Sequence, residues 1–298
     1  MKTRKITPIL LFLSLGFFLF NSCQKESGSP FSEDDLNMVE DDALAEAIFS
    51  DVMESVNTAT NMIDDMLYGS GSLKSMTTGC PTISVDKPDT ENWPKIITID
   101  WGEGCEGFYG QTRSGMIKIT ITGRYRTPGT SRTIEFFDYY FNGIHVEGTK
   151  TVTNNGRNEN ENLTFTATLD GGRITIPAKD DGSDDIVLTK SFTKTREWAE
   201  GENTFNPFDD VYFITGSAAG TNFKGMTYNR TIQVPLEWSA SCRFIKSGSI
   251  LLEMTDREPI LLDYGNGECD NEATITRNGE TKTILLRHKL CPALVYSI

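Results

Sequence analysis

The chain has 298 residues, with 42 acidic and 28 basic side chains and a formal net charge of −14. This charge excludes a general nucleic-acid-binding surface, because phosphate backbones repel an acidic protein, and it disfavours flat docking on anionic lipid headgroups. The length is sufficient for one large hydrophobic core or two modest ones.

The first 22 residues have the three zones of a secretory signal peptide. Three basic side chains lie within the first five positions, an apolar run extends from Ile6 to Phe20, and the small residue Ser22 directly precedes Cys23. The run is shorter than the about 20 apolar residues that a membrane-spanning helix needs. We therefore expect residues 1–22 to be removed on export.

Cys23 resembles the cysteine of a lipobox, which is acylated after cleavage, although Phe20 and Asn21 depart from the usual aliphatic and small residues. The following Gln24-Lys25-Glu26 is similar to the surface-export signal of Bacteroidota-type envelope lipoproteins. This resemblance implies a lipid anchor at Cys23, in the outer membrane and facing the cell surface. The acyl chains would hold firmly, since each buried methylene contributes about 0.8 kcal/mol. Plain secretion, with Cys23 left in the cleaved peptide, is the alternative.

The next two segments differ sharply in composition. Small and charged residues fill residues 23–32, which predicts a flexible tether. Residues 33–68 carry apolar side chains at helical spacing, with eleven acids and no Lys or Arg, and Ser32 is a suitable N-cap. We expect an acidic helix whose apolar stripe packs on the rest of the protein, either continuous or with a break near Ser50. A free coiled-coil stalk is the alternative.

Residues 69–80 predict a linker, and residues 80–298 predict a β domain. From about residue 95 the apolar positions alternate, as at Ile117, Ile119 and Ile121. Short strands with frequent turn signals favour a mainly β, antiparallel, sandwich-like domain, built as one large sandwich or as two intertwined sheets. The turn signals are Pro128-Gly129, Asn155-Gly156, Asp170-Gly171-Gly172, Asp181-Gly182 and Asn278-Gly279.

An internal repeat relates residues 80–122 to residues 242–288. Each unit has a cysteine, then an Asp-aromatic-Gly-x-Gly turn with a second cysteine just beyond it, then Arg-Ser-Gly or Arg-Asn-Gly before a strand. The matched arginines are Arg113 and Arg277. Identities at such constant spacing indicate a shared substructure. A weaker echo relates Tyr140-Phe141 and Gly148-Thr149 to Tyr212-Phe213 and Gly220-Thr221.

The repeat also suggests a pairing for the cysteines. Disulfides persist outside the cytoplasm, and a cysteine just past each turn can join an earlier strand. We therefore predict the pairs Cys80–Cys105 and Cys242–Cys269, which leaves Cys291 unpaired.

The duplicated turns supply the candidate ligand or cation contacts. These are Asp100, Trp101 and Glu103 in the first unit and Asp263, Tyr264 and Glu268 in the second. Paired carboxylates are typical of glycosidases and converging oxygens of Ca²⁺ sites, but turn capping and surface charge explain the same residues. The four tryptophans and nearby tyrosines could line a sugar-binding surface or fill the core.

No motif predicts a catalytic residue, a metal site or a cofactor. The acidic segment 180–185 lacks the alternating ligand spacing of an EF-hand, and His288 with Cys291 lacks further zinc ligands. The leading hypothesis is therefore a lipid-anchored envelope or cell-surface protein that binds a partner, such as a glycan or an envelope protein. The alternatives are a polysaccharide hydrolase that uses the carboxylates of the duplicated turns, and a purely structural envelope subunit with the acidic helix on a partner.

Overall fold

The computed structural model describes residues 31–69, 79–106, 110–178, 183–204, 206–242 and 244–286. The expected signal peptide, Cys23 and nearly all of the tether lie outside these residues, as do residues 180–182, His288 and Cys291. Within the described part of the chain, no helix combines the length and the hydropathy needed to cross a membrane.

The acidic segment forms one continuous helix, α1 (Glu33–Tyr68), without a break at Ser50. Ser32 and Asp35 form a capping box, in which each side chain accepts a hydrogen bond from the other residue's backbone amide. At the other end, the amide of Gly69 donates to the carbonyl oxygen of Asp65. At 1.5 Å per residue, the 36 residues extend over about 54 Å.

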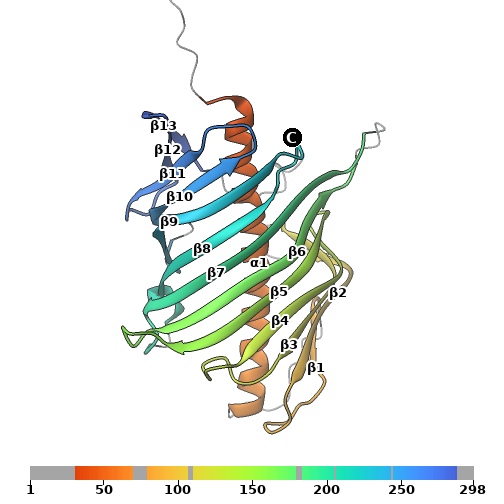
Figure 1. Ribbon diagram of the computed structural model, residues 1–298. Coiled ribbons are helices and arrows are strands. Elements are labelled where there is room, and N and C mark those ends of the chain that lie inside the picture. Colours follow the sequence, from red (N-terminus) through yellow and green to blue (C-terminus); the bar gives the residue numbers. More distant parts are fainter. Residues whose placement is uncertain are drawn as a thin grey trace, which may run out of the picture. The chain divides into compact units, whose positions relative to one another are not determined.

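The remaining elements form a mainly β, antiparallel domain, as the sequence predicts. Thirteen strands follow one another in sequence order across a single sheet, so each strand pairs with its neighbours in the chain. There is no second sheet among the described residues; α1 covers one face in its place (Figure 1). The strands are β1 (Thr82–Val85), β2 (Lys95–Glu106), β3 (Thr112–Ile121), β4 (Ser131–Phe141), β5 (Ile144–Arg157), β6 (Leu163–Ile176), β7 (Ile186–Glu200), β8 (Val211–Thr221), β9 (Thr227–Ser239), β10 (Ile245–Met254), β11 (Ile260–Asn266), β12 (Glu272–Arg277) and β13 (Glu280–Leu285), and the short 3₁₀ helix η2 (Pro207–Asp209) precedes β8.

The core lies between α1 and the covered face of the sheet. The central strands alternate strictly: Leu163, Phe165 and Ala167 of β6 are buried, while the threonines between them are only half-buried. The middle and C-terminal part of α1, residues 44–63, joins the apolar cluster of β1–β8. The first turns join a second cluster, formed with β9–β12. The single helix therefore completes both halves of the core.

Two of the predicted turns are instead irregularities within strands. Asp170-Gly171-Gly172 lies inside β6, where the register with both neighbouring strands shifts, and Asn155-Gly156 lies near the end of β5. The prediction of tight turns there was wrong, because a glycine with positive φ also serves a β-bulge. Asn278-Gly279 does form the two-residue connection of β12 and β13, with positive φ at both residues.

The duplicated units lie at opposite ends of the strand order. Both predicted disulfides, Cys80–Cys105 and Cys242–Cys269, are present. The Asp100 carboxylate accepts a hydrogen bond from the Gly102 amide at 2.8 Å, and Asp263 accepts one from Gly265 at the same distance. The two turns therefore share their capping chemistry as well as their sequence.

The weaker echo has no such structural counterpart. Tyr140-Phe141 ends β4 and Gly148-Thr149 lies in β5, whereas Tyr212-Phe213 and Gly220-Thr221 both belong to β8. One copy therefore contains a hairpin and the other a single strand.

Candidate functional site

Two adjoining surface depressions lie over β2, β3 and β4, and together they are called the β2–β4 depression here. Their volumes are about 470 and 380 Å³. Glu103, Ser114 and Tyr140 line both, so the two form one continuous area. The lining of the second adds Asp100, Gly102, Gly115, Met116, Phe137 and Asp138.

A β-bulge shapes this area. The pairing of β3 with β4 shifts register between Ser114 and Met116, and Gly115 there has φ +79°. A Cβ at Gly115 would lie 1.9 Å from the carbonyl oxygen of Asp138, so only glycine fits. Ser114 pairs with Tyr140 and Met116 with Phe137, which places both rings beside the bulge.

The depression combines ring faces with carboxylates. The ring of Tyr140 stacks on His145 with 4.7 Å between centroids, and Phe137 is 42% exposed with the Lys118 ammonium 4.6 Å above its ring. Asp100, Glu103 and Asp138 add oxygen acceptors. Such a surface offers stacking and hydrogen bonding to a polar ligand with apolar faces.

The remaining predicted contacts lie elsewhere. Trp101 is buried and packs on Tyr139 at 5.3 Å, so it belongs to the core. Tyr264 is half-buried against the second apolar cluster, where burial raises its pKa to about 12. Asp263 and Glu268 lie at the exposed second turn. Asp100 belongs to β2 and Asp263 to β11, nine strands apart, so the two carboxylates cannot flank one sugar bond as the hydrolase alternative requires.

No group of three or more His, Cys, Asp or Glu side chains among the described residues is placed to hold a metal ion.

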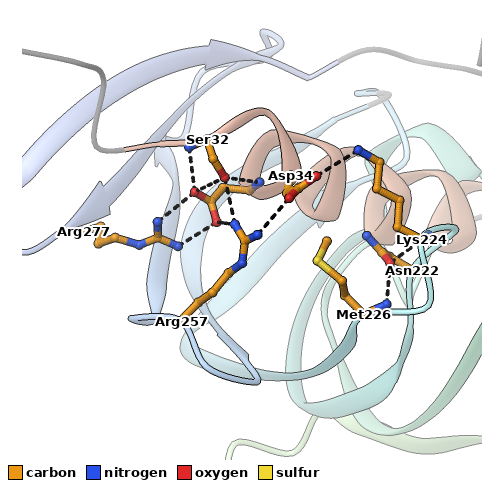
Figure 2. Close-up of polar contacts among 8 residues, drawn as sticks. Ser32, Asp34, Asn222, Lys224, Met226, Arg257 and Arg277 are labelled. Atoms are coloured by element: carbon orange, nitrogen blue, oxygen red, sulfur yellow. Dashed lines mark hydrogen bonds and ion pairs between the residues drawn. The ribbon is translucent and has the colours of Figure 1, made fainter.

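A second polar site, which the sequence reasoning missed, lies between α1 and the sheet. Its first part holds the start of the helix (Figure 2). Arg277 donates to both Asp35 oxygens at 2.8 and 3.0 Å, and Arg257 donates to Asp34 and Asp35 at 2.8 and 3.0 Å. Burial opposes the Asp35 charge, but the hydrogen bonds from Arg277, Ser32 and Arg257 outweigh it and hold its pKa well below the ordinary value.

The middle of α1 places two carboxylates among three cations. The Lys190 ammonium lies 2.6 Å from Asp42 and 3.2 Å from Glu46, and Lys194 reaches Glu46 at 2.5 Å. Arg230 lies within 3.4 Å of both carboxylates. Burial opposes both negative charges, but these cations lower the pKa of Asp42 and of Glu46. Both carboxylates are therefore ionised at neutral pH.

The repeat supplies a third contact. Arg113 donates to both Asp51 oxygens, the closest at 2.7 Å, just as its counterpart Arg277 does with Asp35. The duplicated arginines thus hold α1 at two points 16 residues apart. Five of the eleven acids of α1 are thus paired with basic side chains of its own chain: Asp34, Asp35, Asp42, Glu46 and Asp51.

Lys150 differs from these cations because no carboxylate lies within ion-pair distance among the described residues. It is 8% exposed, and its ammonium lies 3.5 Å from the Phe49 carbonyl oxygen. Burial lowers the pKa of Lys150 to about 7; the nearby cations Lys194 and Arg196 add to this, against the attraction of Glu46.

Comparisons with protein-family models, curated proteins and solved structures find no match for this chain. The functional argument therefore rests on the geometry of the two sites.

We predict that Lys150→Met stabilises the protein. The folded-state pKa of about 7 lies below the ordinary 10.5, so protonation favours the unfolded chain, and stability decreases as the pH falls from about 10 to 7. Removing the amine should raise the free energy of unfolding at pH 7 by about 2–4 kcal/mol and flatten this pH dependence. Urea unfolding across that pH range measures both effects.

Lys190→Met is the matched comparison. It leaves the buried Asp42 without its closest cation and should destabilise by about 3–5 kcal/mol. Equal destabilisation by both substitutions would contradict the distinction between a paired and an unpaired buried lysine.

Proposed function

We propose that this chain is a lipid-anchored binding protein of a bacterial cell envelope, displayed at the cell surface, and that it takes a glycan in the β2–β4 depression. The observation that carries the proposal is the placement of Tyr140 and Phe137 beside Asp100, Glu103 and Asp138 over one continuous area. Ring faces stack on the apolar faces of sugars, and carboxylates accept hydrogen bonds from hydroxyl groups.

The anchor proposal rests on Cys23 and the signal peptide before it. Eight residues separate Cys23 from Ser32, the N-cap of α1. Arg257 and Arg277 hold the first turn of the helix that follows.

Acylation is tested by labelling expressing cells with radioactive palmitate. We expect label in the protein and recovery of the protein in the outer-membrane fraction, and Cys23→Ser should remove both. An unlabelled wild-type protein released into the medium would contradict the anchor and favour plain secretion.

Glycan binding is tested with the purified protein on a panel of neutral and acidic oligosaccharides, followed by calorimetric titration of those retained. Tyr140→Ala should weaken binding by about tenfold or more, since a central aromatic contact supplies much of the affinity of a small site. Phe208→Ala is the control, because Phe208 is 68% exposed in η2 and does not line the depression.

Two results would overturn the proposal. One is the absence of saturable binding across the panel. The other is a Tyr140→Ala affinity equal to that of the wild-type protein.

A further inference from the structure

A group of cations on the helix-covered face of the sheet forms no ion pair among the described residues. Arg132 of β4 and Arg196 of β7 have no carboxylate within ion-pair distance among the described residues, and neither has Lys150 of β5 beside them. The strand register places these residues near one row across the sheet, in which Arg132 pairs with Val152, Val152 with Ala167, and Ala167 with Lys194. Lys150 precedes Val152 by two residues on β5, and Arg196 follows Lys194 by two residues on β7. We call Arg132, Arg196 and the rings around them the Arg132–Arg196 cluster.

Aromatic rings surround both guanidinium groups. Arg196 lies over Tyr212 at 4.4 Å and near Trp238 at 5.6 Å, and Arg132 lies 4.0 Å from the centre of the Tyr125 ring. The one hydrogen bond from Arg132 goes to Asn57 of α1 at 3.2 Å, and the Nε of each arginine is buried without a partner. Ring faces attract a cation but do not replace the hydrogen bonds lost with its water.

The lack of an ion pair at these arginines is unusual for this chain. Acidic side chains outnumber basic ones by 42 to 28, and the buried cations Lys190, Lys194 and Arg230 all have carboxylates. Burial, together with the charge of Arg196, lowers the pKa of Arg132, while Tyr125 and Asp64 oppose this change. The described residues therefore hold two guanidinium groups that form no ion pair and whose buried Nε donors are unmatched.

The cluster is accessible from the surface. Arg196, Tyr125 and Trp238 are half-buried, and Asn57 is exposed, whereas Arg132 is 6% exposed. The two arginines therefore differ in access, since Arg196 is partly exposed and Arg132 is almost fully buried beside the exposed Asn57.

We propose that the Arg132–Arg196 cluster binds a phosphate or sulfate group, either as the free ion or carried by a sugar. Each guanidinium group presents parallel N–H donors that match the oxygens of such an anion, and a bound anion would accept hydrogen bonds from donors that the described residues leave unpaired. The cluster shares no residue with the β2–β4 depression, so the glycan proposal and this one succeed or fail separately.

The test measures thermal unfolding and calorimetric binding of the purified protein with sodium phosphate and sodium sulfate, against sodium chloride at equal ionic strength. We expect phosphate or sulfate to raise the melting temperature with a saturable binding isotherm. Arg196→Met should weaken binding by about tenfold or more, and Arg196→Lys should give an intermediate loss, because the charge remains while the paired donors are removed.

Arg173→Met is the control, because Arg173 is an exposed arginine of β6 that lies 3.5 Å from Glu147. Arg196 is half-buried, so Arg196→Met tests whether the cluster binds the anion even where Arg132→Met does not fold. Glucose 6-phosphate that binds more tightly than inorganic phosphate supports a sugar-borne group, and equal affinity supports the free ion.

Either of two results overturns the proposal. The first is that neither anion acts differently from chloride on the wild-type protein. The second is that Arg196→Met binds the anion as tightly as the wild-type protein and the Arg173→Met control.

Discussion

The structure depends on the ionic contact between the acidic helix α1 and the basic side chains of the sheet face that it covers. Asp42 and Glu46 meet Lys190, Lys194 and Arg230 in the middle of the helix, while Asp35 and Asp51 meet the duplicated Arg277 and Arg113. Buried charges are costly unless paired, so the sheet face excludes a helix of different charge pattern or register. Apolar burial supplies most of the driving force, and the ion pairs decide where α1 lies.

This arrangement explains how a single sheet of thirteen strands obtains a core. One face of each central strand is apolar, and α1 closes it over both halves of the sheet. Asp35 and Asp51 lie about 24 Å apart on the helix, at 1.5 Å per residue. The repeat thus has a structural role at the two ends of the strand order, where each unit contributes a disulfide-linked turn and an arginine to the helix.

The sequence predicts the parts of this fold that local chemistry determines. The N-cap Ser32 and the apolar stripe predict α1, and the spacing of the repeat predicts both disulfides. The sequence does not distinguish a turn from a bulge at Asp170-Gly171-Gly172, because both need a glycine with positive φ. It also does not decide between one sheet and two, because strands of both arrangements alternate apolar and polar residues. The charge network had a readable signal: a buried helix with eleven acids and no base requires cations facing it, and Lys190 and Lys194 lie four residues apart on one face of a single strand. The β2–β4 depression had no such signal, since a bulge brings Tyr140 to Ser114 only in three dimensions.

Native-state hydrogen exchange tests most directly whether α1 and the sheet form one cooperative core. The account predicts that the amides of the central turns of α1, residues 42–56, exchange only through global unfolding, with the same free energy and denaturant dependence as those of β5, β6 and β7. Exchange of α1 at a much lower free energy, while these strands remain protected, would contradict a single cooperative core. The helix would then unfold independently of a sheet that is stable alone.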